Sequence, residues 1–392
     1  MNNKELGIYI HIPFCKKKCY YCDFVSFSNL ENKQTGYIEA LKKEISCYDL
    51  EEYNVTTIYI GGGTPSYIDC YEIKEILDEL RKRLKNNETK FSDIEITIEV
   101  NPGTVDKEKL EVYKLSGVNR LSIGLQSTKD ILLKEIGRIH TYKEFLQSYE
   151  HAKQVGFENI NVDLMLGLPN QSIQDMKDSL KEVIKMEPNH ISIYSLIVEE
   201  KTPIKKLIEE GELQLPEEIQ ERRMYWYVKS MLELSGYNHY EISNFAKEGR
   251  ESKHNMNCWE QKEYIGLGVA AHSYINGIRY SNVTDLDCYI KNMMELKNVK
   301  KQLQSKTNII YNICEVQNLE DKQKEYMLLG LRKIQGVSIT KFKEKYVENP
   351  IFLFRKQMEK LTKEDLLQID GDYIRLTNKG LDFANQVWEE FV

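Results

Sequence analysis

Short apolar runs alternate with amphipathic, charge-laced segments across the first half of the chain. The segments between the runs have helical length and spacing, as at residues 71–85 and 172–186. The runs, rich in β-branched and aromatic residues, are 7–12, 57–60, 94–100, 121–125, 160–166 and 191–197. Six strands joined by helices indicate parallel βαβ units, so we expect an α/β fold. A doubly wound sheet and a complete or incomplete barrel both fit this pattern.

Beyond residue 198 the alternation stops. A charged, proline-containing connection precedes a predicted helix at 217–234, and a dense segment follows at 254–274. From about Leu319 the pattern is helical, and a predicted hairpin and a last helix follow, an order compatible with a small winged-helix-like domain. We therefore expect three parts, which are residues 1–200, residues 201–315 with additional α+β elements, and the winged-helix-like residues 316–392.

The charges of the chain are nearly balanced. It carries 54 Lys and Arg against 61 Asp and Glu, so no overall attraction draws it to nucleic acid or to an anionic membrane. No secretory segment is visible, and the longest apolar stretches, such as residues 191–198, are far shorter than the roughly 20 residues that span a bilayer. We expect a cytoplasmic protein, whose cysteines are reduced thiols, core residues or metal ligands.

Glycine and polar residues stand where several predicted strands end. They are Gly61, Gly62, Gly63 and Thr64 after the second strand, Glu99 at the third, Gln126 at the fourth and Asp163 in the fifth. In parallel α/β folds ligands bind at the carboxyl ends of the strands. We therefore expect these residues to converge on one face of the sheet.

Three cysteines lie close together in the loop after the first predicted strand. The sequence Cys15-Lys-Lys-Lys-Cys19-Tyr-Tyr-Cys22 can wrap three thiolates around one soft-metal centre, which is zinc or an iron–sulfur cluster. Structural zinc sites usually add a second pair of ligands, and no second pair follows nearby. Three ligands on a four-iron cluster leave one iron open to a small molecule. The lysines between them should help to keep the sulfurs ionised.

The CX3CX2C spacing after a first strand resembles the radical S-adenosylmethionine (SAM) superfamily, which implies a partial (β/α)6 TIM-like barrel. The flanking YIHIPFC at residues 9–15 is similar to the oxygen-independent coproporphyrinogen III oxidase family. The true oxidases of that family resemble CX3CX2CXC and carry an extended amino-terminal segment, whereas here Phe24 takes the fourth cysteine's place and the strand begins at residue 7. This departure is typical of the HemW-like haem-chaperone branch, and the resemblance runs from Tyr9 to Val392.

The resemblance implies a [4Fe–4S] cluster on Cys15, Cys19 and Cys22, with SAM on the open iron. It also implies the residues around SAM, since GGGTP at residues 61–65 looks like the family's glycine loop. The implied SAM residues are Tyr9, Gly61, Gly62, Gly63, Thr64, Glu99, Gln126, Arg138 and Asp163. An arginine can bind the SAM carboxylate in a fork, and an acid can hold the ribose hydroxyls.

A second motif, HNMNCW at residues 254–259, resembles the HNXXYW motif that HemW-like proteins associate with haem. The resemblance implies His254 as an axial ligand and Trp259 as a flat face for the porphyrin. Cys258 replaces the family's tyrosine, and it is either a further ligand or a small core residue. His272, after a glycine-rich approach, is a further candidate.

Three functions remain open at this point. The first is a HemW-like haem chaperone that passes haem to an acceptor haemoprotein, some acceptors lying at membranes, with a homodimer as one open state. The second is an oxygen-independent coproporphyrinogen III oxidase, in which SAM supplies a radical. The third is a zinc-stabilised module whose carboxyl-terminal domain contacts nucleic acid, which the overall acidity disfavours.

Overall fold

The computed structural model describes residues 4–296 and 311–392 and has a parallel sheet at its core. The six strands expected in the first half are all present, and each pairs in parallel with its neighbour in the order β1-β2-β3-β4-β5-β6. They are β1 (Lys4–Ile12), β2 (Tyr53–Gly62), β3 (Glu95–Val100), β4 (Arg120–Gln126), β5 (Asn159–Leu166) and β6 (His190–Ser195). The predicted α/β class with a parallel sheet is therefore confirmed.

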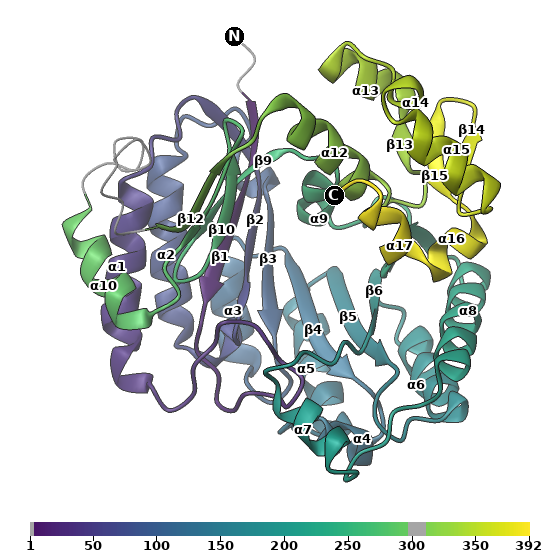
Figure 1. Cartoon of the computed structure of the whole chain (residues 1–392). Coiled ribbons are helices and arrows are strands. Elements are labelled where there is room, and N and C mark those ends of the chain that lie inside the picture. Colours follow the sequence, from purple (N-terminus) through teal and green to yellow (C-terminus); the bar gives the residue numbers. More distant parts are fainter. Residues whose placement is uncertain (1–3, 297–310) are drawn as a thin grey trace.

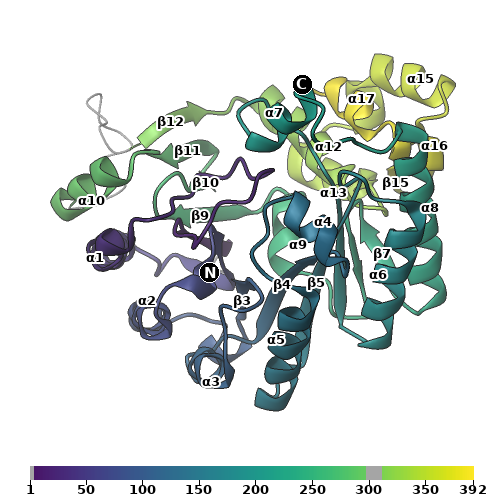
Figure 2. The ribbon, with the colours of Figure 1, turned by 90° about the horizontal axis from the view of Figure 1, so that it is seen from below.

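Helices cover the outer side of this curved sheet, and the strands line its inner side (Figure 1, Figure 2). The long helices of the repeat are α1 (Gln34–Ser46), α2 (Cys70–Arg83), α3 (Lys107–Leu115), α5 (Tyr142–Val155), α6 (Ile173–Lys185) and α8 (Glu218–Leu234). Their apolar faces pack on the strands in one continuous core, because a βα unit buries both its helix and its strand only by stacking beside the next unit. The one-sided cover distinguishes this arrangement from a doubly wound sheet.

The barrel is incomplete, since further strands extend both ends of the sheet. In the described residues the order is β12-β11-β10-β9-β1 at one end and β6-β8-β7 at the other. These strands are β7 (Asn238–Glu241), β8 (Asn244–Ala246), β9 (Glu263–Leu267), β10 (His272–Ile275), β11 (Ile278–Asn282) and β12 (Tyr311–Val316). Strand β9 runs parallel to β1, whereas β10 to β12 form an antiparallel meander beyond it. Short helices in this half are α4 (Asp130–Glu135), α7 (Pro203–Glu209), α9 (Lys253–Trp259) and α10 (Leu286–Glu295), and 3-10 turns η1 (Glu31–Lys33), η2 (Pro65–Tyr67) and η3 (Phe91–Asp93) precede α1, α2 and β3.

The carboxyl-terminal residues form a smaller unit with a core of its own. It contains α12 (Leu319–Gly330), β13 (Val337–Ser338), α13 (Ile339–Tyr346), α14 (Pro350–Leu353), α15 (Arg355–Lys363), β14 (Leu367–Asp370), β15 (Tyr373–Leu376), α16 (Asn378–Asp382) and α17 (Ala384–Glu389). The expected hairpin is β14–β15, with β13 beside β15. The helices of this unit are short. Helices α13 and α14 are separated where Val347 takes φ 67° and Pro350 starts a new turn, and α16 and α17 are separated at Phe383.

The two ends of the parallel strands carry different parts of the molecule. In Figure 1 the strands run downwards, so that α4 and α7 lie at their carboxyl ends, while α9 and the carboxyl-terminal unit lie at their amino ends. The fold therefore presents two separate faces on which chemistry can be placed.

No helix among the described residues is long and apolar enough to cross a bilayer.

Candidate functional site

The three cysteines lie in the loop between β1 and η1 and line one pocket together with Gly62 and Gly63. The backbone fixes this loop at both ends. Cys15 N–H donates to Phe27 O at 2.9 Å, and Phe27 N–H donates to Pro13 O at 2.7 Å. The sulfurs therefore face the glycine loop, as an iron–sulfur site bordering SAM requires.

Burial controls the ionisation of these thiols more than the neighbouring lysines do. Burial raises the pKa of Cys15 and of Cys22, and the opposing effect of Lys18 is smaller in both cases. The Lys18 ammonium group is in addition bound to Phe24 O at 2.8 Å. Lys18 therefore lowers the pKa of both thiols, in the expected direction, but its effect is smaller than that of burial. A bound metal centre would favour the thiolates further.

The described residues contain no group of three Cys, His, Asp or Glu side chains that converges closely enough for a single ion. A single tetrahedral zinc ion needs such convergence, with sulfur ligands at about 2.3 Å. In an iron–sulfur cube each thiolate binds a different iron, so the sulfurs stand farther apart. Three thiols that line one pocket are compatible with a cluster in which each sulfur binds a different iron.

The glycines of the GGGT loop, which follows β2, are required by the protein's own packing. A Cβ on Gly63 would lie 2.9 Å from Phe14 O and 3.0 Å from Cys15 Sγ. Gly62 has φ +113°, and a Cβ there would lie 2.6 Å from the ring of His11. Thr64 Oγ1 contacts Cys15 Sγ at 3.5 Å. The loop thus sits directly on the cysteine loop, a second reason for glycine besides close approach to a ligand.

Two carboxyl groups face the base of this pocket from β3 and β5. Glu99 accepts hydrogen bonds from Tyr59 Oη at 2.9 Å and from Gly62 N–H at 3.2 Å. Burial, with a smaller contribution from Asp163, raises the pKa of Glu99 to about 7. Burial also raises the pKa of Asp163, against hydrogen bonds from Asn161 and Ser122. A cationic ligand with hydroxyl donors would stabilise both carboxylates.

Arg138 and Gln126 contribute polar atoms to the pocket that have no partner. Arg138 donates to Asn101 Oδ1 at 2.9 Å and to Gly124 O at 2.7 Å, and it contacts Cys19 Sγ at 3.6 Å. Its buried Nε and the buried Oε1 of Gln126 lack a partner. Gln126 has φ 64°, where β4 and β5 shift register. Such orphaned buried atoms are expected where a ligand completes the site.

Seven of the nine SAM candidates line this pocket. The two that do not are Tyr9 and Gly61. Tyr9 lies inside the barrel, where its hydroxyl bonds to His11 Nδ1 at 3.0 Å, and His11 Nε2 bonds to Val25 O at 2.8 Å. A Cβ on Gly61 would lie 3.0 Å from Glu99 and from the ring of Tyr59.

Sequence reasoning missed several residues of this site, Tyr59 and Ser122 among them. Tyr59 supports Glu99, and Ser122 lines the pocket beside Asp163. The period of two along a strand was the available signal, because Tyr59 precedes Gly61 by two residues and Ser122 precedes Gly124 by two.

The haem candidates do not form one site in the structure. The HNMNCW motif lies in the helix α9, at the amino ends of the strands. His272 is exposed and begins β10, which follows the carboxyl end of β9. The motif and His272 are therefore separated by the length of β9, so they do not lie together around one porphyrin.

Within α9, His254 and Trp259 contact partners inside the protein, and Cys258 is held as a neutral thiol. His254 is 7% exposed, and its Nδ1 bonds to Thr57 Oγ1 at 2.9 Å. Burial raises the pKa of Cys258 to about 11, which keeps the thiol protonated at neutral pH. The guanidinium of Arg332 lies 4.4 Å from the centre of the Trp259 ring and covers one of its faces.

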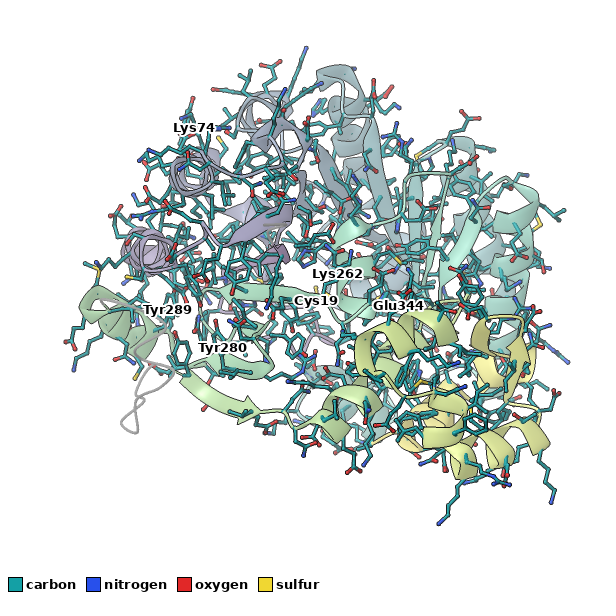
Figure 3. The ribbon with its side chains drawn as sticks, turned by 90° about the horizontal axis from the view of Figure 1, so that it is seen from above. Cys19, Lys74, Lys262, Tyr280, Tyr289 and Glu344 are labelled. Atoms are coloured by element: carbon teal, nitrogen blue, oxygen red, sulfur yellow. The ribbon has the colours of Figure 1, made fainter. Side chains whose placement is uncertain are left out.

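A second cavity, of about 930 Å³, lies between the amino ends of the strands and the carboxyl-terminal unit. Lys253, Met256 and Asn257 line it from one face of α9, and Glu260, which follows the helix, lines it as well. Lys333 and Arg375 line it from the carboxyl-terminal unit. Lys262 lines the same cavity, and Figure 3, seen from the amino ends of the strands, shows it beside the carboxyl-terminal unit that carries Glu344. We call this space the α9 cavity.

Comparisons with known proteins agree with the geometry. Residues 9–183 match the model of the Radical SAM superfamily, and residues 317–383 match that of the HemN C-terminal domain. The solved structure described as coproporphyrinogen III oxidase (HemN) from Escherichia coli, a radical SAM enzyme, has a TM-score of 0.84 at 23% identity and covers 99% of this chain and 90% of its own. This likeness shows the fold. The superfamily implies a [4Fe–4S] cluster and SAM, and the cysteines, the glycine loop and the unpartnered polar atoms fit both.

Full-length relatives narrow the family further. The chain is 38% identical over 387 residues to the heme chaperone HemW of Bacillus subtilis, with 98% of each chain covered. It is 32% identical over 391 residues to the heme chaperone HemW of Escherichia coli, with 99% of this chain and 98% of the relative covered. Because such identity extends over both chains almost entirely, this protein belongs to the HemW family of the radical SAM superfamily.

Proposed function

We propose that this protein is a haem chaperone, which binds a [4Fe–4S] cluster, SAM and haem and passes the haem to an acceptor haemoprotein. The observation that carries the proposal is the full-length similarity to relatives that bear this name, across the barrel and the carboxyl-terminal unit alike. The pocket beside the cysteines supports the cofactor part of the proposal.

In this proposal Cys15, Cys19 and Cys22 hold the cluster, and its open iron binds the amino and carboxylate groups of SAM. Arg138 supplies a free guanidinium N–H toward the SAM carboxylate. Asp163 accepts hydrogen bonds from ribose hydroxyls, and Glu99 braces the glycine loop beside it. When bound, the two cofactors supply a redox-active centre and a sulfonium nucleotide. The chaperone function uses them to shape the protein and to gate haem transfer, with SAM cleavage suppressed.

The haem is best accommodated in the α9 cavity. Its volume of about 930 Å³ is at the upper end of the ~300–1,000 Å³ usual for small-molecule sites. Met256 offers a thioether, which is a known axial ligand of haem iron. Lys253 and Lys333 make no ion pair with any residue that the structure describes, so both are free for haem propionates. His254, Cys258, Trp259 and His272 were the sequence candidates. The contacts of His254 with Thr57 and of Trp259 with Arg332 favour the outer face of α9 instead.

The alternative function is oxygen-independent coproporphyrinogen III oxidation, and the completeness of the SAM pocket favours it. Phe24 opposes it, because the oxidase pattern has a cysteine there. Phe24 lines the pocket and is 63% exposed, which leaves an apolar ring at the entrance instead of a thiol.

An anaerobic experiment on reconstituted protein separates the two functions. Haem is titrated in the presence and absence of SAM, and coproporphyrinogen III is then supplied with dithionite as reductant. We expect about one haem per chain, transfer of haem to an apo-haemoprotein such as apomyoglobin, and no protoporphyrinogen. Formation of protoporphyrinogen at a catalytic rate would replace the chaperone by the oxidase.

The proposed location is the cytoplasm. The proposed acceptors are haemoproteins, including membrane-bound ones that the chaperone contacts at their exposed surface. Nucleic acid is not a proposed partner, because the net charge is -7. A homodimer, if it forms, is proposed to use an edge of the sheet. Light scattering of the cofactor-loaded protein measures the oligomeric state.

A further inference from the structure

A stack of aromatic rings runs through the inside of the barrel from α9 to the cofactor loops. The ring of His254 lies 5.2 Å from that of Tyr59, and the ring of Tyr59 lies 6.3 Å from that of Tyr9. Tyr9 in turn lies 6.0 Å from His11. Tyr9 and His11 stand at alternate positions of β1 and Tyr59 stands on β2, so that these three side chains face the barrel interior, while His254 comes from α9.

Tyr59 and Tyr9 each connect this stack to the loops around the cofactor pocket. Tyr59 Oη donates to one oxygen of Glu99, and the other oxygen accepts from Gly62 N–H in the glycine loop. Tyr9 bonds to His11, which bonds to Val25 O, three residues after Cys22. The position of Tyr59 therefore sets the Glu99 carboxylate, and Tyr9 secures the end of the cysteine loop.

Several hydrogen bonds fix His254 at the α9 end of the stack. Its Nδ1 bonds to Thr57 Oγ1 at 2.9 Å. The backbone N–H groups of His254 and Lys253, in the first turn of α9, donate to the buried carboxylate of Glu95 at 3.1 and 3.2 Å. A carboxylate at a helix amino terminus is favourable to the helix dipole as well. This anchoring holds the imidazole against Tyr59.

We propose that His254 is a positioning residue for the SAM pocket, which acts through Tyr59 on Glu99, and that it does not ligate haem iron. The inference rests on the SAM site of the superfamily and goes beyond haem transfer. Removal of the imidazole leaves an unfilled buried space next to the Tyr59 ring. Tyr59 can then move into that space, toward α9. Its hydroxyl then leaves Glu99, and the carboxylate loses one of its two hydrogen bonds.

The test is a double-mutant cycle on the full-length, cluster-loaded protein. We expect His254→Ala and Tyr59→Phe each to weaken SAM binding about tenfold in titration calorimetry. Because both act through one hydrogen bond, the double variant should lose little more than either single variant. His254→Phe retains a ring under Tyr59 and should recover most of the affinity. Additive losses in the double variant would overturn the proposal.

A second set of measurements separates positioning from haem ligation and from misfolding. His151→Ala removes an imidazole from the outer helix α5, away from both pockets, and serves as the matched control, with SAM affinity unchanged. Iron content and thermal unfolding of each variant report the loss of fold directly. We expect His254→Ala to bind haem with unchanged stoichiometry and an unchanged axial-ligand spectrum. Loss of the haem spectrum in His254→Ala with SAM affinity retained would refute the positioning role and leave the chaperone function standing.

Discussion

The pocket at the carboxyl ends of the strands and the α9 cavity at their amino ends are built in different ways. The first is lined by buried groups with fixed partners, such as Arg138 on Asn101 and Gly124. The second is wider, and its charged groups stand on a helix, a strand edge and the carboxyl-terminal unit. A preorganised set of buried donors suits a cofactor that stays bound, whereas an open cavity between two units suits a ligand that must leave again.

Helix α9 connects the two regions, because its inner face holds His254 under Tyr59 while its outer face lines the cavity. A ligand that moves α9 would therefore act on the SAM pocket, and by linkage SAM would change the affinity of that ligand by the same factor. The comparison predicts that substitutions in the first region have large effects and those in the second have small ones.

The largest effect is expected for Cys19→Ala. Removal of one of three thiolates should abolish the [4Fe–4S] cluster, and with it the visible absorbance and the electron paramagnetic resonance signal of the reduced protein. Cys288→Ala is the matched control, since Cys288 is exposed on α10 and away from the pocket. Retention of a full complement of iron in Cys19→Ala would contradict the assignment of the cluster.

Arg138→Gln should weaken SAM binding by about 10- to 100-fold. The substitution removes a charged donor, and a hydrogen bond to a charged group contributes about 1.5–3 kcal/mol. Titration calorimetry with SAM measures the change. The iron content should stay unchanged, because Arg138 only contacts Cys19 Sγ and does not ligate iron. Equal affinity in the variant would exclude Arg138 from the ligand contact.

The pH should affect SAM binding by up to about tenfold between pH 6 and pH 8. The folded-state pKa of Glu99 is raised from 4.5 to about 7, so the carboxyl group is protonated in much of the protein at pH 6. A cationic sulfonium favours the carboxylate, and binding at pH 6 must first release that proton. Affinity should therefore increase with pH, and Glu99→Gln should remove this dependence. A profile that is the same in both proteins would assign the titration to another group.

The smallest effect is expected in the α9 cavity. Lys333→Gln should weaken haem binding by about two- to fivefold, since a partly exposed ion pair contributes at most about 1 kcal/mol. Met256→Ala should change the absorption spectrum of bound haem more than its affinity. Lys74→Gln, on the outer helix α2, controls for the loss of a positive charge. A haem spectrum insensitive to Met256 would move the iron ligand elsewhere.

The six strands, their parallel pairing and the convergence of strand-end residues were predictable because each depends on local patterns. The alternation of apolar residues specifies strands, and parallel strands must bring their carboxyl ends to one edge. The same logic failed for the HNMNCW segment. The seven residues of α9, which include this segment, carry too little periodicity to distinguish a short helix from a loop. Ser252 caps the helix through Asn255 N–H only in the folded chain.

The sequence by itself determined the alternation of strands and helices, the cysteine loop and the glycine loop, since each is a contiguous pattern with a physical requirement of its own. Only the tertiary structure decided that His254 lies under Tyr59 while Met256, two residues later, faces the α9 cavity. The side of a helix that a residue occupies follows from sequence, but the surface against which that side packs is set by contacts between residues about 200 positions apart.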